Sequence, residues 1–345
     1  MVERRNRWIE IILAVLLMFL ATGCASTVKM ETRRVRGAFE CVGELSPARY
    51  GLSSVAVGQD IYLIGGAQLL SAYNGGLLNF IQKFDASTGE LVVVKTGIVP
   101  RRYHTSVFHK GKIYIMGGVT ADRPMGQIRL IETDKVEIYD LATGQISMGA
   151  PLPRTRYQAA SALVDGKIYL IGGQRSAGLK AGSERPVGSV DIYDIASDSW
   201  SRGPSLPVAR SCDVAVRKGK IYAVGGYNGM SLGRVDVFDP AVNQWSRGTD
   251  IPVPVSAHRC YLMNNKLLVI GDYKILNFVC QYDFETDSWT KIESDFRGCR
   301  HHAVATDGVF VYIFGGVRGS GGTGSVGRNL VSVPYIQRIS TLKLM

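Results

Sequence analysis

The sequence contains a repeated pattern, and an arginine recurs at one position of it. The distance from this arginine to the glycine pair that follows differs by no more than one residue between copies. The members of this set are Arg49, Arg101, Arg156, Arg210 and Arg300, with a second arginine at Arg102. The remaining copy has Ser256 at this position and Arg259 slightly further on. Because a guanidinium group binds a carboxylate or phosphate through paired hydrogen bonds, these arginines predict a site for acidic ligands.

Aromatic side chains and a histidine stand beside these arginines. Tyr103, Tyr157 and His301 complete the predicted ligand-binding set. The sequence leaves a second role for the arginines open, in which they hydrogen-bond loop carbonyls or pair with neighbouring acids inside a repeated scaffold.

The glycine pairs that follow the arginines recur at steps of 44 to 55 residues. A period of this size is typical of stacked or radially arranged units. The pairs are Gly65-Gly66, Gly117-Gly118, Gly172-Gly173, Gly225-Gly226 and Gly315-Gly316, with a degraded copy at Gly271-Asp272. A Tyr-Asp or Phe-Asp pair follows in five units, and Trp200, Trp245 or Trp289 stands six residues beyond the aspartate in three of them.

This order of glycine pair, aromatic-Asp pair and tryptophan resembles the kelch repeat over about residues 34 to 345. The resemblance implies an all-β, six-bladed β-propeller with four antiparallel strands per blade. Apolar runs such as Lys167–Ile171 are consistent with strands buried on both faces. We expect blades near 49–100, 101–153, 154–207, 208–252, 253–297 and 298–345, and a strand within residues 37–47 that completes the last blade and closes the ring. An alternative uses residues 340–344 as the last strand.

Propeller geometry predicts where the arginines lie. The connections between blades and the loops joining second to third strands share one face of an up-and-down propeller. The arginines begin the first strands, so we expect them around the mouth of the central channel. Similar arginines in a eukaryotic kelch adaptor bind acidic peptide motifs, so the resemblance implies an acidic peptide as ligand. The ligand that we expect is an acidic protein segment or an anionic glycan. The short loop of the fifth unit predicts a gap in the rim.

The first residues have the pattern of an export signal. Arg4, Arg5 and Arg7 precede an apolar run over residues 11–21. Residues 20–24, which end at Cys24, resemble a bacterial lipobox. The resemblance implies a signal peptide over residues 1–23, lipidation of Cys24, a tether over 24–36 and the propeller over 37–345. We therefore expect an exported lipoprotein anchored to the envelope, at the outer membrane facing the periplasm or the surface in a Gram-negative organism. An ordinary secretory peptide and an uncleaved anchor are the alternatives.

Composition narrows the partners. A formal net charge of +11 favours acidic partners or anionic surfaces. The chain lacks a basic run interleaved with aromatic residues, which argues against nucleic acid. Five cysteines besides Cys24 cannot all pair within one chain, and their spacing does not match a metal site. They are Cys41, Cys212, Cys260, Cys280 and Cys299, and their disulfide state stays open. We expect a monomer with no metal and no cofactor.

Two functions follow from these features. The first is a non-enzymatic binding scaffold of the envelope. The second is an enzyme that resembles exported kelch sialic-acid mutarotases, which bind a sugar carboxylate with arginine and move protons with an acid or base. Glu184, beside Arg185, is the only acid that we would assign to that catalytic role.

Overall fold

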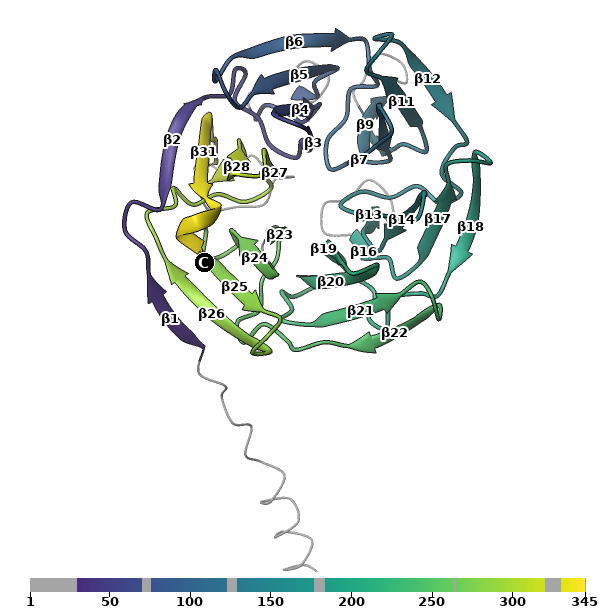
Figure 1. Cartoon of the computed structure of the whole chain (residues 1–345). Helices are drawn as coiled ribbons and strands as arrows, with labels where there is room; N and C mark the ends of the chain where they lie inside the picture. The colour runs from purple at the N-terminus through teal and green to yellow at the C-terminus, as the bar shows by residue number, and fades with distance from the viewer. Residues whose placement is uncertain are drawn as a thin grey trace, which may run out of the picture. The chain divides into compact units, whose positions relative to one another are not determined.

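Six sheets, each with four antiparallel strands, stand around a central axis in the computed structural model of the unit Glu31–Met345 (Figure 1). The structure describes residues 30–69, 76–122, 129–176, 184–263, 265–319 and 330–344. Each sheet is a blade, and the innermost strands of neighbouring blades contact each other all the way round. The predicted six-bladed propeller of four-stranded blades is confirmed.

The first three blades follow one another along the chain, with their strands given from the channel outward. Blade 1 contains β3 (Ser53–Val57), β4 (Asp60–Ile64), β5 (Phe80–Asp85) and β6 (Leu91–Thr96). Blade 2 contains β7 (Thr105–His109), β8 (Lys112–Met116), β11 (Val136–Asp140) and β12 (Ile146–Gly149). Blade 3 contains β13 (Ala160–Val164), β14 (Lys167–Ile171), β17 (Val190–Asp194) and β18 (Ser199–Gly203).

The last three blades keep the same order of strands. Blade 4 contains β19 (Ser211–Arg217), β20 (Lys220–Tyr227), β21 (Val235–Asp239) and β22 (Gln244–Arg247). Blade 5 contains β23 (Arg259–Met263), β24 (Lys266–Ile270), β25 (Val279–Asp283) and β26 (Ser288–Glu293). Blade 6 contains β27 (Ala303–Thr306), β28 (Phe310–Phe314), β31 (Tyr335–Ser340) and β2 (Phe39–Glu44).

Short hairpins and one helical turn complete the described elements. The hairpins are β9 (Val119–Asp122) with β10 (Arg129–Glu132), β15 (Gln174–Ser176) with β16 (Glu184–Pro186), and β29 (Val317–Arg318) with β30 (Val331–Ser332). The helical turn is the 3-10 helix η3 (Thr341–Leu344). No helix among the described residues has the length and apolar character needed to span a membrane.

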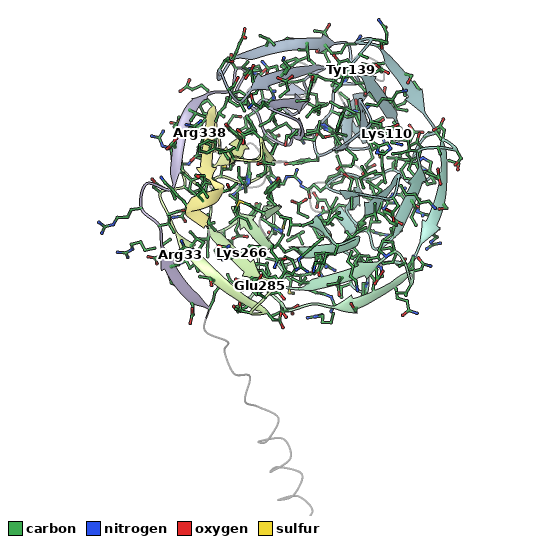
Figure 2. All side chains as sticks on the ribbon, in the orientation of Figure 1. Arg33, Lys110, Tyr139, Lys266, Glu285 and Arg338 are labelled. Atoms are coloured by element: carbon green, nitrogen blue, oxygen red, sulfur yellow. The ribbon has the colours of Figure 1, made fainter. Side chains whose placement is uncertain are left out.

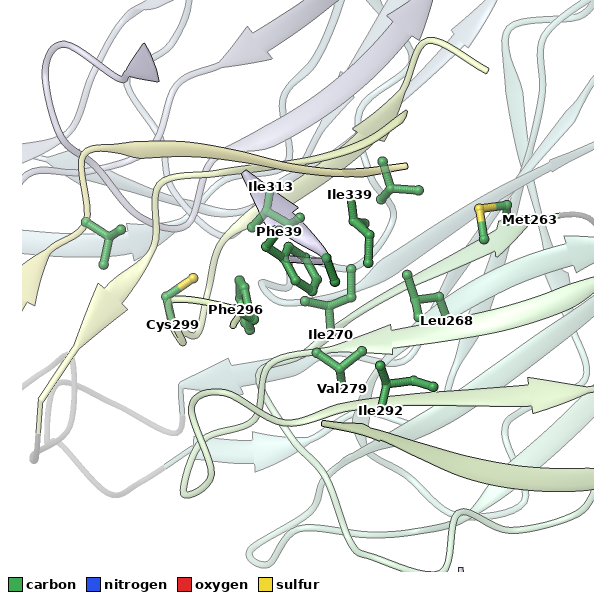
Figure 3. Close-up of a cluster of buried hydrophobic side chains, with 13 residues drawn as sticks. Phe39, Met263, Leu268, Ile270, Val279, Ile292, Phe296, Cys299, Ile313 and Ile339 are labelled. Atoms are coloured by element: carbon green, nitrogen blue, oxygen red, sulfur yellow. The ribbon is translucent and has the colours of Figure 1, made fainter. Parts of the chain in front are cut away.

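The strand β2 closes the ring, as the sequence predicted. It pairs antiparallel with β31, so that Phe39 lies opposite Ile339. Phe39 also packs on Phe296, with ring centroids 5.0 Å apart, in an apolar cluster that joins blades 5 and 6 (Figure 3). The alternative closure through residues 340–344 is wrong, because Thr341–Leu344 forms η3.

A fifth strand in blade 5 was not expected. β1 (Glu31–Arg34) pairs in parallel with β26, although the sequence placed these residues in a tether over 24–36. Arg34 forms an ion pair with Glu293 at 3.1 Å, and Arg33 lies at the outer edge of the unit (Figure 2). Cys24 and the expected signal peptide lie outside the described residues.

The tryptophans of three repeats connect blades 3, 4 and 5 to the blade before each of them. The indole N–H of Trp200 donates to the Ala150 carbonyl at 2.9 Å, and that of Trp245 donates to the Pro204 carbonyl at 2.9 Å. Trp289 donates in the same way to the Thr249 carbonyl at 3.0 Å. Trp289 is buried and Trp200 and Trp245 are half-buried, and an indole N–H removed from water needs such an acceptor, so these residues serve the scaffold.

Candidate ligand-binding site

Five of the predicted ligand-binding arginines are buried. Arg49, Arg101, Arg156, Arg210 and Arg300 each expose 2% of their surface or less. Arg101 donates to the carbonyls of Gly117 and Lys135 at 3.1 and 3.0 Å, and Arg210 donates to the Gly225 carbonyl at 2.8 Å. The prediction that these five line an open channel mouth is therefore wrong, and the alternative of a scaffold role fits the structure.

Three of these arginines have a buried acid as partner. Arg101 pairs with Glu137 at 2.5 Å, Arg210 pairs with Asp236 at 2.9 Å, and Arg156 pairs with Asp191. Each acid lies on the third strand of its blade, three residues before the aspartate of the aromatic-Asp pair. This repeated acid is a sequence signal for buried pairing, and the prediction of exposed arginines did not take it into account.

Arg49 has a glutamine where the next three blades have an acid. Its Nη1 donates to Gln82 Oε1 at 2.6 Å, and burial lowers the pKa of Arg49 to about 9. In blade 2, Glu137 also accepts from the backbone N–H of Val99 at 3.0 Å. Blade 1 has Pro47 at the position of Val99, and proline has no N–H to donate. Gln82 instead donates to the Ser46 carbonyl at 2.9 Å, which a carboxylate could not do.

Backbone hydrogen bonds link successive blades directly after these arginines. His301 N donates to the Ala257 carbonyl at 3.1 Å, and Gly51 N donates to the His301 carbonyl at 2.9 Å. Tyr103 N then donates to the Gly51 carbonyl at 2.7 Å, and Gln158 N donates to the Tyr103 carbonyl at 2.8 Å. All five residues have a positive φ, between 51° and 62°. These bonds join the channel end of blades 5, 6, 1, 2 and 3.

Blade 4 breaks this series. Ser211 stands in blade 4 where the other blades have a residue with positive φ, but it is the first residue of β19. Within the described ranges, its backbone does not hydrogen-bond to the corresponding residue of either neighbouring blade. β19 and β20 instead pair as far as Ser211 and Tyr227. The close approach requires glycine at Gly226, where φ is +114° and an added Cβ would lie 1.9 Å from the Ser211 carbonyl oxygen.

A cavity of about 600 Å³ lies where the series is broken. It is lined from blade 4 by Ser211, Asp213, Tyr227 and Met230, and from blade 5 by Arg259, Tyr273 and Lys274. Tyr103, His301 and Glu184 also line it, so four of the predicted site residues meet here with Arg259 included. The two short loops after the glycine pairs of blades 4 and 5 both contribute, at the side where the sequence predicted a gap in the rim.

Two other predicted residues lie outside the cavity lining. Tyr157 is buried, and its hydroxyl donates to Gln174 Oε1 at 3.3 Å. Arg102 donates to the Tyr50 hydroxyl and lies over the Tyr50 and Tyr103 rings, 5.4 and 5.3 Å from their centroids. Arg102 therefore supports the aromatic residues beside the channel.

Arg259 is held in a fixed orientation within the cavity wall. Its Nε donates to the His302 carbonyl at 3.0 Å, and its Nη1 contacts Asp213 Oδ1 at 3.4 Å. Asp213 is fixed in turn, because its Oδ2 accepts from the backbone N–H of Cys260 at 2.6 Å. A guanidinium has more N–H donors than these two contacts use, and 29% of the Arg259 side chain is exposed. The arrangement presents an oriented donor for one carboxylate.

The histidines around the channel are neutral. Burial holds the pKa of His104, His258 and His302 below its usual range, and it lowers the pKa of His301 to about 3. Among the described residues, no three His, Cys, Asp or Glu side chains are grouped so as to hold a metal ion.

These histidines predict that stability falls in mild acid. The unfolded chain takes up protons below pH 6.5, whereas the folded histidines do not, so the folded state is disfavoured as the pH drops. Urea unfolding should show a loss of roughly 1.4 kcal/mol for each histidine that stays neutral, or about 4 to 5 kcal/mol in total, between about pH 7.5 and 5.5, above the range in which carboxylates titrate. Equal stability at both pH values would contradict the burial of neutral histidines.

Four of the five cysteines in the described residues have the character of buried apolar residues. Cys212, Cys260, Cys280 and Cys299 are buried free thiols, and Cys41 is exposed. Burial raises the pKa of Cys212 to about 11, which keeps the thiol protonated and unreactive.

Comparison with known families agrees with this architecture. The KLHDC2/KLHL20/DRC7 Kelch-repeats domain model matches residues 139–272, and the Kelch motif model matches residues 100–153. The chain therefore carries a kelch-repeat β-propeller domain. Propellers of this kind typically serve as protein-binding scaffolds.

Curated proteins with kelch repeats are similar to parts of the chain. Kelch repeat and BTB domain-containing protein 12 of Danio rerio is 30% identical over 195 residues, which cover 52% of this chain and 30% of that protein. Kelch-like protein 38 of Homo sapiens is 25% identical over 264 residues, which cover 74% of this chain and 42% of that protein. Beta-scruin of Limulus polyphemus is 27% identical over 192 residues, which cover 55% of this chain and 20% of that protein. The matched region is less than half of each relative.

Proposed function

We propose that this chain is a non-enzymatic binding scaffold whose cavity binds an acidic protein segment or an anionic glycan. The observation that carries the proposal is Arg259, which the His302 carbonyl and Asp213 hold in place at the wall of a 600 Å³ cavity. The buried arginines are excluded from contact with a ligand, so the recognition of an acid in the cavity falls to Arg259 and Lys274 among the described residues that line it. The kelch-repeat relatives support a binding role.

Thermal unfolding of the chain from Ala25 onward tests this proposal. Acidic peptides and acidic sugars should each be added at low and at moderate salt. A true ligand raises the Tm by mass action, and part of the rise should be lost at higher salt because exposed charges are screened. A panel in which no acidic compound raises the Tm would contradict the proposal.

We also propose that the N-terminal segment anchors the propeller to a bacterial envelope as a lipoprotein. The lipobox-like residues before Cys24 support this. Cys24→Ala should abolish incorporation of a labelled fatty acid and leave residues 1–23 attached, because the thiol that carries the acyl chains is lost. Cys41→Ala is the matched control and should retain both the label and the cleavage. Incorporation of the label into Cys24→Ala would refute lipidation at this residue.

A sugar-converting enzyme is the second candidate. The specific observation in its favour is that Glu184 lines the same cavity as Arg259 and His301, so an acid and a carboxylate-binding group border one space. Glu184→Gln would then abolish conversion of an acidic sugar while retaining its affinity. Absence of turnover with every acidic sugar would leave the binding scaffold as the function.

A further inference from the structure

We infer that the segment bound in this cavity carries a single carboxylate flanked by apolar side chains, and not a run of acids. The inference rests on the proposed function and narrows the class of partner. Three features of the described cavity wall carry it: its charge balance, its exposed apolar rim and the contacts that hold this rim in place.

The charges that line the cavity cancel. Among the described lining residues, Arg259 and Lys274 are cationic, and Asp213 and Glu184 are anionic. Asp213 neutralises part of the charge on Arg259, which it contacts directly. One carboxylate can accept from the N–H groups of Arg259 that its contacts with Asp213 and the His302 carbonyl leave over. Lys274 is the other cation of the lining, and Asp213 and Glu184 together offset both positive charges, so a run of carboxylates would be repelled. The chain's net charge of +11 is therefore not concentrated in this cavity.

Three large apolar side chains with exposed surface line the cavity. Tyr227 is 41% exposed, Met230 is 67% exposed and Tyr273 is 37% exposed. They come from the end of β20 and from the two short loops of blades 4 and 5. Contiguous exposed apolar groups with polar neighbours mark interaction sites.

The loop of blade 5 is held by an aspartate that replaces a repeat glycine. Asp272 is 3% exposed, and its Oδ2 accepts from the backbone N–H groups of Lys274 and Ile275, each at 2.9 Å. Its Oδ1 accepts from Ser256 N at 2.9 Å. The degraded glycine pair thus becomes a cap that fixes this loop.

Tyr273 is fixed by one of the buried arginines. The Arg300 guanidinium lies 4.1 Å from the centroid of the Tyr273 ring, and its Nη1 donates to the Tyr273 carbonyl at 3.1 Å. In the other loop, Asn228 N donates to the Met230 carbonyl at 3.2 Å, and Leu232 N donates to Gly226 at 2.9 Å. A rim with its backbone held in this way is prepared to receive apolar side chains with little further ordering.

Peptide binding to the full chain in detergent micelles tests the inference. Two labelled peptides of equal length are compared by fluorescence anisotropy, one with a Leu-Glu-Leu core and one with a Glu-Glu-Glu core. The first should bind about tenfold more tightly and lose only about threefold in affinity between roughly 50 and 300 mM salt, because apolar contacts are not screened. A peptide with a Leu-Gln-Leu core should bind about tenfold more weakly than the first.

Variants of the rim provide the matched comparison. Met230→Ala should weaken the Leu-Glu-Leu peptide by about tenfold. Met148→Ala, at a residue 53% exposed on β12 and outside the cavity lining, should leave its affinity unchanged.

Other outcomes separate this inference from the proposed function. Tighter binding of the Glu-Glu-Glu peptide, lost steeply with salt, would overturn the inference and leave the acidic-ligand scaffold standing. Preference for an acidic sugar over both peptides would overturn it as well. If neither peptides nor sugars bind, both the inference and the proposed function fail.

Discussion

Replacing Asp191 with asparagine is expected to lower the free energy of unfolding by about 3 to 5 kcal/mol. Asp191 is 1% exposed and pairs with Arg156, which is equally buried, and with Arg154. Removing one partner leaves an uncompensated buried guanidinium, whose desolvation is no longer offset by the carboxylate. Urea unfolding of the two proteins at neutral pH measures the difference.

The control is an ion pair on the surface. Arg247 and Asp250 contact each other with side chains 49% and 40% exposed. Asp250→Asn should cost less than about 1 kcal/mol, because exposed pairs are screened by water. A loss below 1 kcal/mol for Asp191→Asn would mean that the arginines of the repeat are not structural. Ligand affinity should be unchanged in both variants.

Deleting residues 1–44 is expected to abolish cooperative unfolding of the propeller. The deletion removes β2, which leaves β31 as an open edge in blade 6 and takes Phe39 out of the cluster with Ile339 and Phe296. Truncation of a buried phenylalanine alone costs about 3 to 5 kcal/mol, and the loss of a whole strand adds its hydrogen bonds. Calorimetry should show a broad, weak transition in place of a sharp one.

A shorter deletion separates ring closure from the strand added to blade 5. Deleting residues 1–36 removes β1 but keeps β2, and should lower the Tm by only a few degrees because β1 is exposed along its length. A synthetic peptide of residues 37–47 should restore the sharp transition to the chain that lacks residues 1–44. A chain without β2 that unfolds as sharply as the full protein would show that closure does not depend on it.

The fold could be predicted from the sequence because each blade repeats the same pattern of residues at the same structural positions. The glycine pairs, the aromatic-Asp pairs and the tryptophans recur at a fixed period, and agreement among several copies outweighs the ambiguity of any one. The pairing of β2 followed from the missing fourth strand of blade 6. Parallel addition of β1 to blade 5 could not be predicted, because Glu31–Arg34 is polar and exposed and has no pattern that specifies a partner.

The candidate site was predicted only in part. An arginine at a repeated position is compatible with a surface ring or with a buried pair, and the decision depends on a partner far away in the sequence. For Arg101 that partner is Glu137, 36 residues later. Reading the acids of the third strands together with the arginines would have favoured burial.

The residues that depart from the repeat proved more informative about the site than those that conform to it. Ser211 lacks the positive φ of its counterparts and leaves the series of backbone bonds open. Asp272 replaces a glycine and fixes the loop that carries Tyr273. Arg259 stands outside the arginine position of the other units and is the guanidinium that lines the cavity. Each departure breaks the repeat where a ligand is proposed to bind.

Titration calorimetry on Arg259→Gln tests most directly whether this cavity is the site. The tightest acidic ligand of the panel is titrated into the unaltered protein, into Arg259→Gln and into Arg247→Gln, with folding of each checked by circular dichroism. Loss of an oriented guanidinium should weaken binding at least about tenfold, whereas the exposed Arg247 should contribute nothing. Equal affinity for Arg259→Gln and the unaltered protein would contradict the assignment and move the search to another surface of the propeller.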